Sequence, residues 1–155
     1  SDLDLNVIAS PGILTTLGLG SCVGIALYDK VNKIAGLAHI MLPSSNTVRS
    51  NANPAKFADT AIDVLLGQMY KIGADKTYII AKIAGGAQMF SFKNQDNDIL
   101  RVGERNVKAT INSLKEHDIA ILACDTGGNY GRTIELYADS GILLVKTIAN
   151  GIKKL

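Results

Sequence analysis

A cysteine follows a glycine-spaced turn near the start of the chain, in Thr15-Thr-Leu-Gly-Leu-Gly-Ser-Cys22. Glycines adopt backbone angles that other residues avoid, so successive N–H groups can converge on one point beside the thiol. The groups concerned are those of Leu19, Gly20, Ser21 and Cys22. Such a point can hold an oxyanion, and we expect its dipoles and a neighbouring imidazolium to lower the pKa of Cys22. A plainer interpretation is that Cys22 only begins a buried strand, because free cysteine is among the most buried residue types.

A nucleophilic thiol needs an adjacent base, and His39 is the candidate. It lies in Leu37-Ala-His-Ile-Met-Leu-Pro43, near the end of a strand pattern. If strands over 22–28 and 33–41 form a hairpin about residue 31, Cys22 and His39 fall almost opposite each other. The alternative is a histidine packed among apolar neighbours, with its nitrogens bonded to the backbone.

Other residues of reactive type carry weaker signals. His117 closes a helical pattern, where a cation is favoured, so we interpret it as a cap or a solvated residue. Cys124 lies in an apolar strand pattern and is expected in the core. Gly18-x-Gly20 is typical of phosphate loops, but no glycine stands at 23 and no Lys-Ser/Thr follows. The glycine-rich segments 82–87 and 125–132 fit either an active-site wall or long turns.

The elements that must position these residues follow from periodicity. Asn53-Pro54 is a helix-start signal, and the amphipathic pattern after it closes at Gly73. A second helix is predicted over 103–116, with Val107, Ile111 and Leu114 buried. Strands are predicted over 12–17, 22–28, 33–41, 78–83, 119–124, 133–137 and 142–148, the last two forming a hairpin that turns at Asp139-Ser140-Gly141. Segments 43–53 and 92–98 are expected to be surface loops. Strands grouped at both ends predict an α+β class with a mixed or largely antiparallel sheet.

Size and composition limit the function classes. A chain of 155 residues with 47% apolar content predicts one domain over residues 1–155. The net charge is only +2, without long runs of one sign, which argues against a nucleic-acid partner. Two cysteines are too few for a disulfide framework, and no zinc-site spacing is present. No apolar stretch reaches about 18 residues and no signal-peptide pattern is present, so we expect a cytoplasmic protein without membrane insertion.

Five segments, in order, closely resemble the signature blocks of the CheD family. They are Thr16-Leu-Gly-Leu-Gly-Ser-Cys-Val23, Ala38-His-Ile-Met-Leu-Pro43, Lys82-Ile-Ala-Gly-Gly-Ala87 with Met89-Phe90, Gly103-Glu-Arg-Asn106, and Asp125-Thr-Gly-Gly-Asn129 with Gly131-Arg132. The resemblance extends from about Val7 to Ile148. It implies a layered α/β fold with a β-sandwich core flanked by helices, similar to cysteine hydrolases such as the deamidase domain of cytotoxic necrotizing factor.

The resemblance also implies a function in chemotaxis adaptation. The family deamidates selected glutamines of methyl-accepting chemoreceptors to glutamate and releases ammonia. Its catalytic cysteine, histidine and supporting threonine match Cys22, His39 and Thr16. Cys22 would form a thioester, the turn amides would hold the oxyanion, and Thr16 would orient the imidazole. No metal or organic cofactor is required.

Receptor cytoplasmic helical bundles are the implied substrate, and we expect a monomer when the protein is free. We expect docking along the glycine-rich rim near Cys22 and the 43–53 loop. An alternative of another class is a regulatory protein that binds the CheC phosphatase and stimulates it. Loss of the Cys22 thiol should abolish deamidation and leave such binding nearly intact.

Overall fold

The computed structural model of the protein describes residues 5–45, 52–89 and 101–155. These contain two α-helices, two short 3₁₀ helices and nine strands. In chain order they are β1 (Leu5–Ala9), β2 (Ile13–Leu19), β3 (Val23–Asp29), β4 (Ile34–Ile40), η1 (Pro54–Lys56), α1 (Ala58–Lys71), η2 (Lys76–Tyr78), β5 (Ile79–Gly85), α2 (Val102–Glu116), β6 (Ile121–Thr126), β7 (Arg132–Tyr137), β8 (Leu143–Thr147) and β9 (Gly151–Lys154).

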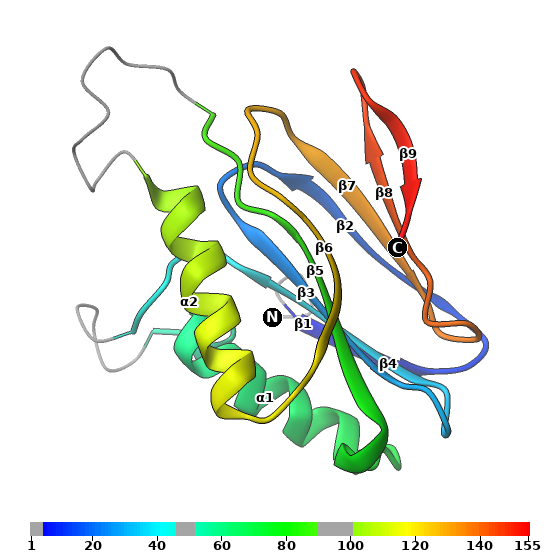
Figure 1. The fold of residues 1–155 in the computed structure, drawn as a ribbon. Coiled ribbons are helices and arrows are strands. Elements are labelled where there is room, and N and C mark those ends of the chain that lie inside the picture. The colour runs from blue at the N-terminus through cyan, green and yellow to red at the C-terminus, as the bar shows by residue number, and fades with distance from the viewer. Residues whose placement is uncertain (1–4, 46–51, 90–100) are drawn as a thin grey trace.

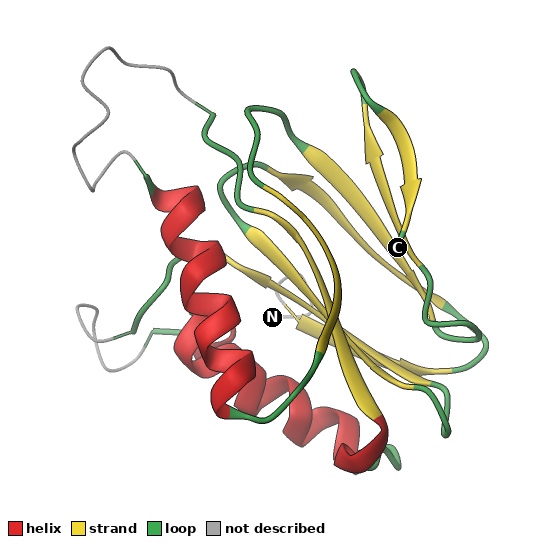
Figure 2. Ribbon diagram, viewed as in Figure 1, coloured by secondary structure: helices red, strands yellow, loops and turns green. Residues whose placement is uncertain are grey.

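Two sheets and a helical layer make up the fold (Figures 1 and 2). The first sheet has the strand order β1-β4-β3-β5-β6, in which only the β5–β6 pair is parallel. The second sheet is antiparallel, in the order β2-β7-β8-β9. Both helices cover one face of the first sheet, and the second sheet packs on the other face. The predicted α+β class, with a mixed and largely antiparallel sandwich flanked by helices, is confirmed.

Alternation along the central strands separates the two apolar layers. In β3, Val23, Ile25 and Leu27 face the helices, whereas Ala26 and Tyr28 face the second sheet. Both faces are covered, so β3 is buried throughout and reads as a continuous apolar run. We call the layer between helices and sheet the helix layer, and the layer between the two sheets the inter-sheet layer.

The predicted elements recur with shifted ends and two additions. Asn53 accepts a hydrogen bond from Ala55 N as a cap does, but it caps the 3₁₀ turn η1, and α1 begins only at Ala58. Strands β1 and β9 were not predicted, because each is a short edge strand. The hairpin of β7 and β8 turns where expected, with Gly141 at φ +76°. The predicted loop over 92–98 lies outside the described residues, as does most of the 43–53 loop.

Two burial predictions were wrong. Cys124 is exposed, because β6 is an edge strand and this side chain points away from the sandwich. Ile111 is also 38% exposed. Helix α2 instead buries a row of small and polar residues together with Leu114, namely Gly103, Asn106, Thr110 and Ser113.

Candidate active site

Cys22 lies in a tight turn between the end of β2 and the start of β3. The turn is fixed from one side, because Ala87 N donates to the Gly20 carbonyl and Gly86 N donates to the Cys22 carbonyl, both at 2.8 Å. Gly85 makes this approach possible, since a Cβ there would collide with the carbonyl oxygen of Cys22. The strand end β5 therefore acts as a platform under the cysteine.

The N–H groups of this turn are available. Across the described residues, those of Gly20, Ser21 and Cys22 donate to no protein acceptor. Leu19, by contrast, is fully buried and pairs with Arg132 in the β2–β7 ladder, so its backbone belongs to the strand rather than to the turn. Three successive unused donors beside a thiol form the kind of concavity that binds an anion.

The thiol itself is half-buried, and burial raises the pKa of Cys22. The sequence predicted the opposite direction, and that prediction was wrong. The physical reason is that desolvation by the inter-sheet layer, against which Cys22 packs, disfavours the thiolate. A resting thiol of this kind needs a base to remove its proton when it attacks.

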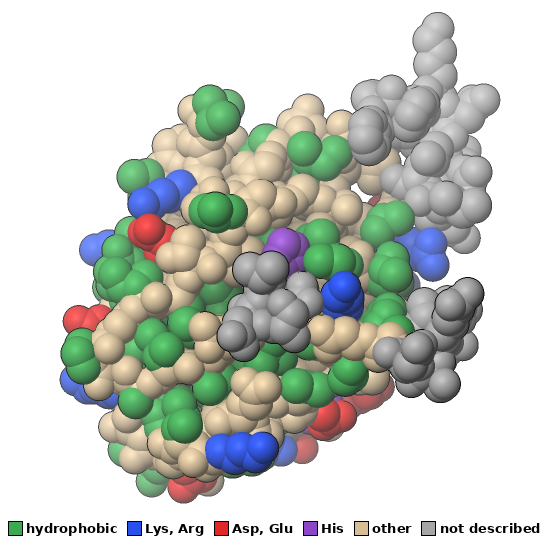
Figure 3. Space-filling view, turned by 180° about the vertical axis from the view of Figure 1, so that it is seen from behind, with side chains coloured by type: hydrophobic (Ala, Val, Ile, Leu, Met, Phe, Trp, Pro, Cys, Tyr) green, Lys and Arg blue, Asp and Glu red, His purple; other side chains and the backbone are tan. Residues whose placement is uncertain are grey.

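His39 lies on the same face of the first sheet as Cys22. Strands β3 and β4 form the predicted hairpin, but the register pairs His39 with Gly24. Cys22 precedes Gly24 by two positions, so His39 is its diagonal neighbour rather than its direct partner. At Gly24 a Cβ would meet Ile134 and Leu19, which shows that this face points to the second sheet. His39 is half-buried. Hydrophobic side chains lie interspersed with polar and charged ones on the face of the molecule seen in Figure 3.

Thr16 reaches the same layer from the opposite sheet. It pairs with Ile134 in the β2–β7 ladder, and it lies on the face of β2 that buries Leu14. That face points inward, and β2 packs over β4, which carries His39. A β-bulge between Thr16 and Leu19 then lets the chain leave the ladder and enter the cysteine turn. The structure thus brings Thr16, Cys22 and His39 to one end of the inter-sheet layer.

Two further segments border the cysteine turn. A Cβ at Gly20 would lie 3.2 Å from Met89 Cγ, so the Met89 side chain covers this glycine while remaining 46% exposed. On the other side Gln88 N donates to the Gly128 carbonyl, which ties the 125–132 loop to the platform. Both glycine-rich segments left open by the sequence therefore border the turn.

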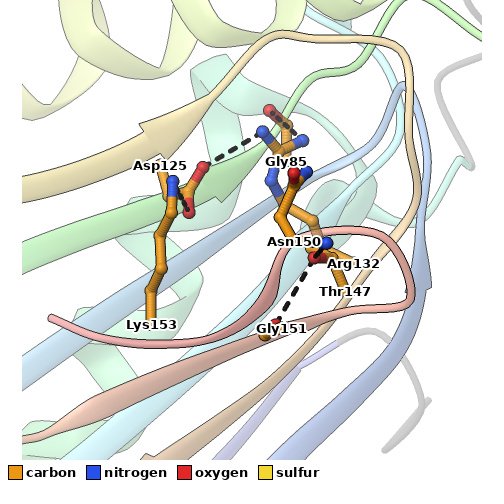
Figure 4. Close-up of polar contacts among 7 residues, drawn as sticks. All are labelled: Gly85, Asp125, Arg132, Thr147, Asn150, Gly151 and Lys153. Carbon is orange, nitrogen blue, oxygen red and sulfur yellow. Dashed lines mark hydrogen bonds and ion pairs between the residues drawn. The ribbon is translucent and has the colours of Figure 1, made fainter.

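A buried ion pair underlies this wall (Figure 4). Arg132 is fully buried and donates to Asp125 Oδ1 at 3.1 Å and to the Gly85 carbonyl at 3.5 Å, and Lys153 reaches Asp125 Oδ2 at 3.3 Å. Tyr130 stacks on the guanidinium at 4.5 Å. The pair joins β5, β6, β7 and β9 directly behind the Cys22 platform.

A pocket of about 640 Å³ opens elsewhere, against α2. Its lining includes Val107, Ile111, Arg101 and Gly127. Gly86 borders it with the side that faces α2, whereas Cys22 and His39 face the second sheet. Chemistry therefore places the candidate site in the cysteine turn and not in this larger pocket.

The remaining reactive residues lie apart from the turn. His117 caps α2 as expected, and its ring contacts the Ser113 carbonyl and Asp63 at 2.7 Å each. Within the described ranges, no three His, Cys, Asp or Glu side chains gather as a metal site would require. In the same ranges no helix is long and apolar enough to cross a membrane.

The fold and the site together define a class of protein. Its members are layered α+β proteins with a cysteine and a histidine at one end of the sandwich. The chain belongs to the CheD family. The family model, described as CheD chemotactic sensory transduction, matches residues 41–147. A "Probable chemoreceptor glutamine deamidase CheD" from Caldanaerobacter subterraneus subsp. tengcongensis is 60% identical, covering 97% of this chain and 92% of that protein.

Two further relatives carry the same kind of name. One from Lachnoclostridium phytofermentans is 54% identical over 98% of this chain and 94% of its own length. The "Chemoreceptor glutamine deamidase CheD" of Halalkalibacterium halodurans is 50% identical, with the same coverage. Among solved structures, the hypothetical protein YfiH of Bacillus licheniformis matches with a TM-score of 0.41 and 15% identity over 71% of this chain and 46% of its own, a likeness too weak for argument.

Proposed function

We propose that this protein hydrolyses the side-chain amide of selected glutamines on chemoreceptor cytoplasmic helical bundles, giving glutamate and ammonia. The observation that carries the proposal is the Cys22 turn, where three unused backbone donors surround a thiol on the same face as His39. The names of the relatives, which are 50–60% identical over nearly the whole chain, support the same activity. The proposal places the protein in the cytoplasm, where the substrate bundles lie.

The chemistry begins with proton transfer from Cys22 to His39. The raised pKa of the thiol makes His39 a true general base rather than a spectator to a preformed thiolate. Sγ then attacks the glutamine Cδ, and the N–H groups of Gly20, Ser21 and Cys22 stabilise the oxyanion. As the tetrahedral intermediate collapses, the imidazolium protonates the departing nitrogen, and ammonia leaves behind a thioester.

Water completes the reaction. His39 removes a proton from water, the hydroxide adds to the thioester carbon, and the C–S bond breaks. The thiolate regains its proton from the imidazolium, so the enzyme returns to its starting state and the product is glutamate. Thr16 orients the imidazole from β2, as the third group of a triad does. All of these steps use protein groups and water.

The alternative, a regulatory partner that stimulates the CheC phosphatase, is not favoured. The names of the relatives give a deamidase. The Cys22 turn also keeps the features that catalysis requires. Monomeric state and docking along the glycine-rich rim stay predictions.

Mass spectrometry of receptor cytoplasmic fragments tests the activity. The wild type should convert specific glutamines to glutamate, whereas Cys22→Ala and His39→Ala should lower the rate by at least about 10³-fold, because each removes the nucleophile or its base. Cys124→Ala is the matched control, since it removes the other, exposed thiol and should leave the rate unchanged. Absence of glutamate with the wild-type protein would refute the proposal for those receptors.

A further inference from the structure

The cysteine turn is held from a second direction by a side chain of α2. Asn106 is fully buried, and its Nδ2 donates to the Ser21 carbonyl at 2.9 Å and to the Met41 carbonyl at 3.0 Å. An amide NH₂ has two donors, so each carbonyl receives one. Asn106 belongs to the segment Gly103-Glu-Arg-Asn106, which resembles a family signature but has no part in the chemistry above.

The two acceptors are the points where strands β3 and β4 separate. The ladder between them ends at the pair Val23 and Ile40, and the next positions would be Cys22 and Met41. Met41 instead donates its N–H to the Lys56 carbonyl at 2.8 Å, away from the cysteine turn. Asn106 thus bridges the nucleophile turn to the end of the strand that carries His39, where no backbone pairing continues.

Helix α2 is seated closely enough to make this bridge rigid. A Cβ at Gly103 would collide with the carbonyl oxygens of Gly86 and Ala87. Those same two residues donate their N–H groups to Cys22 and Gly20. The three successive carbonyls of the turn, at Gly20, Ser21 and Cys22, are therefore all held by donors from α2 and from the two residues that follow β5.

Holding a carbonyl fixes the N–H that follows it. In a trans peptide unit the C=O of one residue and the N–H of the next point in opposite directions. Because Asn106 draws the Ser21 carbonyl towards α2, the Cys22 N–H points away from α2, towards the face of Cys22 and His39. The N–H of Cys22 lies nearest to the attacked carbon and is the natural oxyanion donor.

Within the described part of the chain, the acceptor of the Asn106 amide is left unpaired by this arrangement. Its Oδ1 is buried and, among the described residues, meets no hydrogen-bond partner. A buried acceptor without a partner destabilises the fold. The two carbonyls need donors, so the amide cannot turn to satisfy Oδ1.

We propose that Asn106 is a positioning residue that aims the Cys22 N–H at the oxyanion of the deamidation reaction. The inference rests on the proposed function and deepens it. Asn106 touches neither substrate nor reacting atoms, and it acts on the oxyanion donor through the Ser21–Cys22 peptide unit. It should therefore affect the transition state and leave substrate binding and thiol ionisation nearly unchanged.

The test compares Asn106→Asp and Asn106→Ser with the wild type on receptor fragments. The aspartate keeps the shape but offers no donor, and the serine offers one donor for two carbonyls. We expect kcat to fall about 10- to 100-fold, somewhat less than the loss of an oxyanion donor itself, with KM changed less than about threefold. Thr110→Val, one turn along the same buried face, is the control and should keep the wild-type kcat.

Alkylation of Cys22 by iodoacetamide separates positioning from general damage, because it needs the thiolate and no oxyanion donor. Its rate and pH profile should match the wild type in Asn106→Ser, which places no charge near Cys22. Folded variants with wild-type kcat would overturn the inference, as would equal losses of alkylation and deamidation. If the wild type makes no glutamate, the proposed function itself fails, which is a distinct result. Two variants of different size ensure that at least one reports on a folded protein.

Discussion

The two buried layers on either side of the first sheet differ in how they are built. The helix layer contains large aliphatic side chains such as Leu65, Met69 and Ile83, and α2 adds buried polar side chains to it. The inter-sheet layer combines apolar side chains with buried charged groups. Lys82 donates to the carbonyls of Gly141 and Leu155 at 2.8 and 2.9 Å, and Arg132 pairs with Asp125.

This difference explains where a site can form. The aliphatic part of the helix layer gains stability in proportion to the area that it buries. A layer that already holds charges on backbone carbonyls can open at one end onto Thr16, Cys22 and His39 without losing its packing. The helix layer therefore supplies aliphatic packing and, through Asn106 of α2, holds the strand ends at the cysteine turn, whereas the inter-sheet layer carries the reactive side chains.

Breaking the buried ion pair of Arg132 and Asp125 should give the largest loss in the free energy of unfolding. Arg132→Met leaves Asp125 buried with only Lys153, whose side chain is 54% exposed, so we expect a loss of about 3–5 kcal/mol in urea unfolding. The double variant Arg132→Met with Asp125→Leu should be more stable than the single one, because no buried charge is left alone. A single variant within about 1 kcal/mol of the wild type would contradict this account of the inter-sheet layer.

Truncating a large side chain in the helix layer should lower the free energy of unfolding somewhat less. Leu65 is fully buried on α1, and Leu65→Ala should lower the free energy of unfolding by about 3 kcal/mol through lost burial and a cavity. Gly67→Ala on the same helix is the control: a Cβ there meets nothing within 4 Å, so it should stabilise by about 0.5–1 kcal/mol. Deamidation should survive in both at temperatures where they are folded. Loss of kcat in folded Leu65→Ala would show that the layers are not separable.

The smallest change in stability should come from His117, at the edge of the helix layer. Burial lowers the pKa of His117, but the acceptors Asp63 and Ser113 outweigh it and hold the pKa above its ordinary value. Both ring nitrogens face acceptors, which only the imidazolium can satisfy with two N–H groups. This stability is therefore fully present below about pH 6.5 and is lost as the pH rises through the raised folded pKa.

Asp63 is 74% exposed, so the contribution should stay under about 1 kcal/mol. Urea unfolding of wild type and Asp63→Asn across this pH range measures it, because asparagine keeps the acceptor and removes the charge. The wild type should be more stable at low pH, and the difference should vanish at high pH. A difference that grows with pH would reverse the assigned sign.

Local patterns were enough to predict most elements. Apolar runs and turn residues located the strands from β2 to β8 and both helices, because these signals depend on neighbours in sequence. Edge strands β1 and β9 were not predicted, because each is only four or five residues long. Cys124 was misplaced for a related reason: an apolar run does not say which of its faces the fold will cover.

The sequence predicted which residues belong to the candidate site better than it predicted how they are arranged. A glycine turn before Cys22, a strand histidine and family resemblance named the residues. The hairpin register, which sets His39 diagonal to Cys22, depends on where the turn at residues 30–33 closes. The sequence presents Asn106 only as part of a motif, and its place on the same helical face as Leu114 is the signal that points to a role in packing against the sheet.

The sequence by itself determined the class of fold, the order of its elements and the reactive residue types, because periodicity and glycine spacing act locally. Only the tertiary structure decided the environment of those residues. Packing of the second sheet raises the pKa of Cys22, and α2 aims the turn amides through Asn106. Desolvation and long-range hydrogen bonds arise between segments far apart in the chain, so no local pattern records them.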